Sequence, residues 1–218
     1  MKMHKGDWMP PEVDAPNPIK DRPDETAYYE PYHGDSMFEC GGKVNRRVAG
    51  HTDKNGRWVD VLYKDYFLAI GFKRHVSVDF DPRWADHNDD LRLPLWDKYG
   101  TFDMFTNMGT SEHIENNQLG FWKNVHNMTN VGGVYVHLTP YPGGKDWPRH
   151  GHWYPTEDFL HSFAENNGWE VEKIGIQRTE PHRNVYGRLR KVHDVPFLGY
   201  DESLLWRNKQ APHVQLNR

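Results

Sequence analysis

The stretch from Phe102 to Ile114, FDMFTNMGTSEHI, concentrates groups that can meet a ligand. It begins with the apolar residues of a buried strand, continues with small and polar residues, and then carries Glu112 beside His113. A carboxylate and an imidazole at such a place can transfer protons or orient a bound molecule. The simpler interpretation is that Glu112 is a first-turn carboxylate favoured by a helix dipole, and that His113 caps or packs.

A second group of reactive side chains lies in residues 145–159, KDWPRHGHWYPTEDF. His150 and His152 could form a substrate wall with the neighbouring aromatic rings, or one of them could act as a general base near neutral pH. On paper the two histidines could also bind zinc or iron together with Asp158 and His161. No clear spacing of two histidines and a carboxylate on defined elements supports this alternative, so the sequence predicts no metal site. His113, His150 and His152 are the candidate catalytic residues.

A third group is basic and could meet a phosphate or an acidic substrate. It consists of Arg178, Arg183, Arg188, Arg190 and Lys191. A strand edge protected by charge is the simpler interpretation.

These groups need elements that position them, and the chain alternates between two kinds of pattern. Strands are predicted at 36–40, 75–80, 90–95, 102–107 and 134–140, and helices at 58–71, 117–128 and 156–168, the last with Thr156 as its N-cap. Two further strands, 169–178 and 184–192, can form an antiparallel pair. This order predicts an α/β fold: a Rossmann-like, mostly parallel sheet with helices on both faces and an antiparallel terminal strand. In such a sheet a ligand binds at the carboxyl ends of the strands, where the strand order reverses.

The chain divides into an N-terminal arm (1–33), one domain (34–200) and a C-terminal tail (201–218). The arm, with Trp8, Tyr28 and Tyr29 as anchors, either wraps the domain, contacts a neighbouring copy in a homo-oligomer or is a loosely ordered tail.

Composition limits the classes of partner. The net charge of −4 argues against a general nucleic-acid coating protein, and the single Cys40 excludes an internal disulfide and a cysteine zinc site. With no apolar run near the ~18 residues that span a bilayer, and no secretion signal, we expect a reducing cytoplasmic setting and no membrane.

The order of the pieces resembles the class I S-adenosylmethionine-dependent methyltransferases. FDMFTNMGTSEHI and FWKNVHNMTNVGGVYVHL resemble the fourth and fifth strand regions of that family, although Val131 stands where a proline is usual. HVSVDFD resembles its second strand and NDDLRLPL its third. The resemblance covers roughly residues 36–192. It implies S-adenosylmethionine as cofactor and a small-molecule acceptor.

The resemblance also implies roles for particular residues. Asp79 would accept the ribose hydroxyls, and Asp90 and the backbone of Leu91 would border the adenine. Asn107 and Gly109 would lie beneath the sulfonium.

The glycine loop departs from the family. FECGGKVNRR offers Glu39, Gly41 and Gly42, which would hold the cofactor, but no third glycine, and an insertion of about residues 43–57 follows it. The loop is either remodelled or degenerate.

The predicted function is methyl transfer from S-adenosylmethionine to a small or medium-sized acceptor. Such a transfer is an in-line displacement on an activated cofactor, so alignment supplies much of the rate and no protein nucleophile is needed. Two alternatives remain: a catalytically inactive methyltransferase-like binding or assembly module, and a different sugar- or nucleotide-directed enzyme on the same fold.

Overall fold

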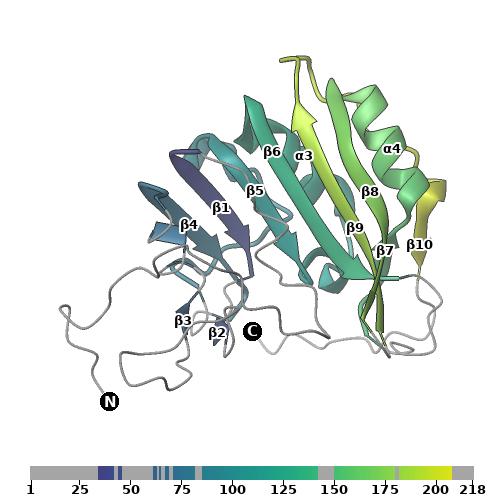
Figure 1. Ribbon diagram of the computed structural model, residues 1–218, viewed down its shortest axis with the longest axis horizontal. Coiled ribbons are helices and arrows are strands. Elements are labelled where there is room, and N and C mark those ends of the chain that lie inside the picture. Colours follow the sequence, from purple (N-terminus) through teal and green to yellow (C-terminus); the bar gives the residue numbers. More distant parts are fainter. Residues whose placement is uncertain are drawn as a thin grey trace, which may run out of the picture.

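The protein is built on a six-stranded sheet with the strand order β4-β1-β5-β6-β9-β8 (Figure 1). A computed structural model describes residues 34–41, 44–45, 61–62, 64, 67–68, 71–81, 85–141, 150–179 and 182–207. The strands of the sheet are β1 (Ser36–Cys40), β4 (Arg74–Val78), β5 (Phe102–Met108), β6 (Thr129–Pro140), β8 (Trp169–Thr179) and β9 (His182–Lys191). The first four in this list are parallel to one another, whereas β9 runs antiparallel to both β6 and β8. The predicted Rossmann-like fold with an antiparallel terminal strand is therefore confirmed.

Shorter elements surround this sheet. The helical ones are α2 (Trp96–Tyr99), η2 (Ser111–His113), α3 (Gln118–Met128), α4 (Glu157–Asn166) and η3 (Glu202–Leu204). β7 (Trp153–Pro155) pairs with β10 (Leu205–Arg207), and β2 (Val44–Asn45) pairs with β3 (Val61–Leu62). Within the described residues no helix has both the length and the apolar character needed to cross a membrane.

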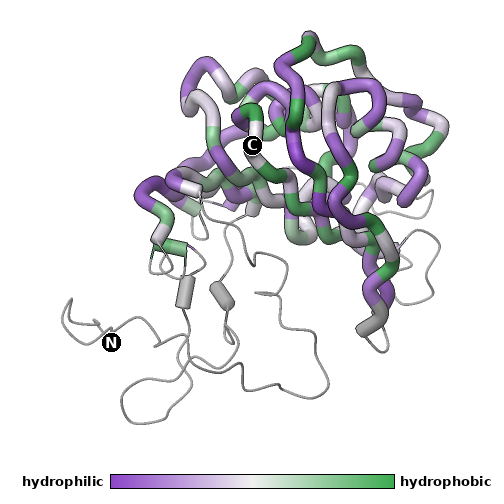
Figure 2. Tube along the Cα trace, turned by 45° about the horizontal axis from the view of Figure 1, so that its top comes forward, coloured by the Kyte–Doolittle hydropathy of each residue, from purple (hydrophilic) through white to green (hydrophobic). Residues whose placement is uncertain are grey.

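Two hydrophobic layers cover the sheet, because successive side chains of a strand point to opposite faces. On β1, Phe38 joins the larger layer, which also contains the apolar faces of α3 and α4. Its neighbour Met37 points to the opposite face and joins the second layer, which also contains Phe67. The backbone of Phe67 is helical. In Figure 2 hydrophobic and hydrophilic stretches follow one another along the described part of the chain. Large aromatic rings supply much of the buried area, with Trp122 fully buried at the centre of the larger layer.

The helix predicted over 58–71 differs from the structure. Val61 and Leu62 were expected in a helix over 58–71, but they form a strand, and helical backbone is described only at Lys64, Phe67 and Leu68. β10 lies within the segment 201–218 that the sequence assigns to a tail, and its Leu205 is buried. The arm and its anchors Trp8, Tyr28 and Tyr29 lie outside the described residues.

The strand predicted at 90–95 is wrong, and Asn124 of α3 supplies the reason. Its side-chain amide donates to the carbonyls of Leu91 and Leu93, and its oxygen accepts from the backbone N–H of Leu95. These backbone groups are thereby satisfied by one buried side chain instead of by a neighbouring strand. The apolar pattern of the segment reflects the burial of Leu91 and Leu95 in the core.

The helix boundaries follow local capping. Thr156 caps α4 as predicted, with its side-chain oxygen accepting from the backbone N–H of Phe159 at 3.1 Å. α3 begins after Asn117, which adopts a left-handed conformation with φ 59° and whose side-chain oxygen accepts from the N–H of Gly120.

Gly120 lies on α3, yet we expect its replacement by alanine to destabilise the protein. A Cβ at this position would collide with the backbone carbonyl of Arg92, which cannot easily move. Alanine is favoured over glycine by about 1 kcal/mol in an open helix. The clash should outweigh this gain and lower the free energy of unfolding by about 1–3 kcal/mol. Urea unfolding monitored by circular dichroism measures this difference.

Gly175→Ala on β8 is the matched control, because nothing lies within 4 Å of a Cβ built there. This variant should unfold at nearly the wild-type urea concentration. Stabilisation by Gly120→Ala would contradict the contact between α3 and the backbone at Arg92.

Candidate functional site

The candidate site lies where the strand order reverses. The chain passes from β1 to β4 on one side and then returns to place β5 on the other side of β1. All three strands are parallel, so their carboxyl ends meet at one edge of the sheet. This is the position at which open α/β sheets bind their ligands.

Gly41 is the residue around which these strand ends close. It follows β1 with φ +79°, and its N–H donates to the carbonyl of Val78 at 2.8 Å. A Cβ built on Gly41 would collide with the hydroxyl of Thr110 and lie 3.5 Å from Oδ2 of Asp79. The same hydroxyl donates to the carbonyl of Cys40 at 2.8 Å. The structure thus brings Gly41 and Asp79 together, and it adds Thr110, which the sequence reasoning did not single out.

Asp79 is half-buried just after β4. Its Oδ1 accepts from the backbone N–H of Asp81 at 2.7 Å, which fixes the carboxylate at the turn. Burial raises the pKa of the Cys40 thiol well above its ordinary value, and the nearby charges of Glu39 and Asp79 raise it further. The end of β1 is therefore flanked by two carboxylates.

Glu39 is placed differently from Asp79. Its carboxylate is almost fully buried, and Oε2 lies 3.1 Å from Nε2 of the buried His75 on β4. Nδ1 of the same imidazole lies 3.9 Å from Oδ2 of Asp86. Glu39 is therefore engaged inside the molecule. His75 was not predicted from the sequence. Its only signal was a histidine at an inward position of a strand rich in β-branched residues.

The two residues expected near the adenine are also engaged. The carboxylate of Asp90 accepts from the guanidinium of Arg92, with the shortest of these contacts at 2.6 Å, and this bond is the main cause of the lowered pKa of Asp90. Leu91 is a core residue. Gly42 lies outside the described residues.

Asn107 closes the turn after β5. Its Oδ1 accepts from the N–H of Ser111 at 3.0 Å, while its amide donates to the hydroxyl of the same serine at 2.7 Å. The amide also lies 3.2 Å from Nδ1 of the buried His137. Gly109, with φ +74°, turns the chain and donates its N–H to the carbonyl of Leu138. Asn107 is fully buried, so it shapes the turn.

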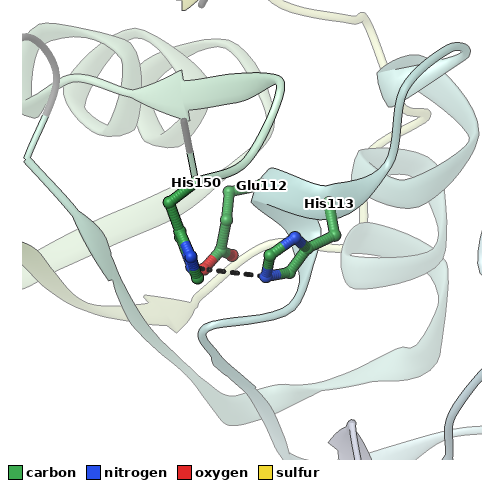
Figure 3. A group of neighbouring side chains, drawn as sticks. All are labelled: Glu112, His113 and His150. Carbon is green, nitrogen blue, oxygen red and sulfur yellow. Dashed lines mark ion pairs between the residues drawn. The ribbon is translucent and has the colours of Figure 1, made fainter. Parts of the chain in front are cut away.

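Of the candidate catalytic histidines, His113 and His150 come together with their ring centroids 4.6 Å apart, and Nε2 of each lies within 4 Å of Oε1 of Glu112 (Figure 3). His152 takes part through its backbone, whose N–H donates to the carbonyl of Glu112. Asp158 and His161, which the sequence could group with these histidines, are exposed on α4 and do not belong to this cluster.

Two members of the basic group share one carboxylate, and β9 is an interior strand instead of a charged edge. Arg188 and Arg190 both donate to Glu172 on the adjacent β8, at 2.6 and 2.5 Å. Lys191 is buried and donates to the carbonyl of His126.

No protein-family model matches this chain, and no curated protein matches it. Solved structures do resemble its fold. This chain is 13% identical to the 1,6-didemethyltoxoflavin-N1-methyltransferase of Burkholderia thailandensis, with a TM-score of 0.49. The match covers 72% of this chain and 71% of that one. For the N-methyltransferase NodS of Bradyrhizobium japonicum the identity is 14%, the TM-score 0.48 and the coverage 73% and 87%. For a TehB-like SAM-dependent methyltransferase of Corynebacterium glutamicum the identity is 17% and the TM-score 0.45, and the match covers 73% of this chain and 82% of that one. At such identities and scores the likenesses carry no argument about the chemistry of this site.

His137 beneath the turn should make the protein sensitive to acid. Burial lowers its pKa from 6.5 to about 3, so between these values the folded state holds one proton fewer than the unfolded state. Stability from the neutral imidazole is present above pH 6.5 and is lost as the pH falls towards 3. In His137→Asn the free energy of unfolding should fall less steeply with decreasing pH over this window, by up to about 1.4 kcal/mol per pH unit.

Urea unfolding at a series of pH values measures this slope. The exposed His193, replaced by asparagine, is the control and should keep the wild-type slope. Equal slopes in the wild type and His137→Asn would show that this imidazole does not titrate as inferred.

Proposed function

We propose that this chain transfers a methyl group from S-adenosylmethionine to a small or medium-sized acceptor. The observation that carries the proposal is the convergence of Gly41, Asp79 and Thr110 at the carboxyl ends of β1, β4 and β5. Bound there, the cofactor would supply a methyl group already activated as a sulfonium. The protein would then need to bind and align, and no nucleophilic side chain is required of it.

The residues at this edge fit an adenosine-bearing ligand in a defined way. Asp79 presents a half-buried carboxylate, which suits a pair of ribose hydroxyls because it offers acceptors only. Gly41 lacks the Cβ that would fill the space beside it, so the backbone can lie close to the turn at Thr110. Glu39 supports this edge from within through His75. Asn107 and Gly109 set the turn that closes the other side of the site.

A second candidate is a catalytically inactive binding or assembly module. The buried pairing of Glu39 with His75 favours it, because a carboxylate held in this way is not offered to a ligand. The glycine motif of the sequence, which lacks a third glycine, favours this module as well. A module of this kind predicts no cofactor binding and an oligomer that persists when Asp79 is replaced.

The proposal is tested by titration calorimetry of the purified protein with S-adenosylmethionine and S-adenosylhomocysteine. The wild type should bind both, and Asp79→Ala should bind at least tenfold more weakly, a loss of about 1.4 kcal/mol or more. The reason is the loss of the carboxylate that accepts from the ribose. Asp97→Ala, an exposed acid on α2, is the matched control and should bind as the wild type does.

Two outcomes would contradict the proposal. A well-folded wild type that binds neither compound would overturn the methyltransferase assignment and favour the module. Unchanged binding by Asp79→Ala would remove Asp79 from the site while leaving the cofactor in place.

A further inference from the structure

Three potential metal ligands converge just after the turn that follows β5. The side chains of Glu112, His113 and His150 point towards one another, two from η2 and one from the segment before β7 (Figure 3). Oε1 of Glu112 lies 3.5 Å from Nε2 of His150 and 3.9 Å from Nε2 of His113. One donor atom from each residue lies within 4.8 Å of the other two, and no other group of three such residues does so in the described part of the chain.

The carboxylate of Glu112 is the unusual member of this cluster. The side chain is 0% exposed, and neither oxygen has a hydrogen-bond donor among the described residues. A buried ionised carboxylate without hydrogen bonds costs several kcal/mol unless a cation compensates for it. The two imidazole nitrogens face it at distances longer than those of a charge-assisted hydrogen bond. A cation among the three donor atoms would compensate the carboxylate and take both rings as ligands.

The backbone holds this arrangement in place. The N–H of His113 donates to the carbonyl of Thr110, and the side chain of Gln118 donates to the carbonyl of Ser111, which fixes η2. The N–H of His152 donates to the carbonyl of Glu112.

Gly151 permits the close approach that places His150. A Cβ on Gly151 would lie 2.8 Å from Cβ, Cγ and the carbonyl oxygen of Glu112, closer than such atoms come in proteins. A glycine between His150 and His152 is therefore required for the segment to lie against Glu112.

We propose that Glu112, His113 and His150 bind a divalent first-row transition-metal ion, such as Zn²⁺ or Fe²⁺. Metal–nitrogen and metal–oxygen bonds of about 2.0–2.2 Å place two ligands of one ion at most ~4.4 Å apart. The contacts of Glu112 at 3.5 and 3.9 Å fall within this limit. Two imidazoles and one carboxylate suit these ions better than Mg²⁺ or Ca²⁺, which prefer oxygen ligands alone.

The exposed side of the site is formed by the histidines. The His113 side chain is 52% exposed and that of His150 is 32% exposed, whereas Glu112 closes the site from below. Three protein ligands leave positions open on that side for water or for an oxygen of a bound molecule. The site lies two residues beyond Thr110, but its metal binding does not depend on the proposed methyl transfer.

The test is titration of chelator-treated protein with Co²⁺ alone, followed by visible absorption, and with Zn²⁺ in competition. The wild type should bind one equivalent of Co²⁺ with d–d bands typical of nitrogen and oxygen ligands, and Zn²⁺ should displace it. Glu112→Gln keeps the shape of the side chain but should weaken Co²⁺ binding at least tenfold. His150→Ala, at a half-buried position, is a second variant with the same expected loss.

His161→Gln is the matched control, because this exposed histidine on α4 lies outside the cluster. It should bind Co²⁺ as the wild type does. Thermal unfolding provides a second readout: Zn²⁺ should raise the Tm of the wild type and of His161→Gln, but not that of Glu112→Gln. Without metal, Glu112→Gln should be at least as stable as the wild type, since it removes a buried charge.

Two results would overturn the proposal. One is the absence of a stoichiometric Co²⁺ or Zn²⁺ site in folded wild-type protein, which would leave Glu112 as the partner of protonated histidines. The other is unchanged Co²⁺ binding in both Glu112→Gln and His150→Ala. Because no S-adenosyl compound is present, neither result depends on the outcome of the cofactor titration.

Discussion

The hydrogen bonds of Asn107 fix the turn on which both proposed sites depend. This fully buried amide bonds both the N–H and the hydroxyl of Ser111, and thereby begins η2 directly after β5. On one side of the turn, the hydroxyl of Thr110 is bonded to the end of β1 beside Gly41. On the other side, η2 presents Glu112 to the segment that carries His150. One side chain therefore sets the distance between the strand-end edge and the histidine cluster.

Tyr135, His137 and Thr139 satisfy one another beneath the turn, whereas the carboxylate of Glu112 has no hydrogen bond among the described residues. His137 contacts the hydroxyl of Tyr135 at 2.9 Å through one ring nitrogen and that of Thr139 at 3.0 Å through the other. Burial raises the pKa of Tyr135 and lowers that of His137, so both remain neutral and cost little to enclose. A network of this kind stabilises one arrangement of the strands because every member has a partner. The carboxylate of Glu112 borders the same region without hydrogen bonds.

Much of the fold could be predicted from sequence, because the apolar periodicity of β1, β4, β5, β6 and α3 and the cap of α4 are local signals. The strand expected at 90–95 failed for a non-local reason: Asn124 binds the backbone groups that a neighbouring strand would have used. The site followed the same rule. Gly41, Asp79 and the pair His113 and His150 were found as residue types, but the partners that define them were not. The pairing of Glu39 with His75, and the need for Gly151, arise from contacts between segments far apart in the chain.

The two buried glutamates of this edge show how one residue type can serve two purposes. Glu39 lies 3.1 Å from a fully buried imidazole, within the distance of a direct ion pair. Glu112 faces two imidazoles at 3.5 and 3.9 Å, too far for that and near enough for a shared cation. Glu39 therefore contributes to the shape of the β1 end, and in the proposed cofactor site the carboxylate offered to a ligand is that of Asp79. In the proposed metal site on the opposite side of the turn, Glu112 is the carboxylate that would meet a positive charge.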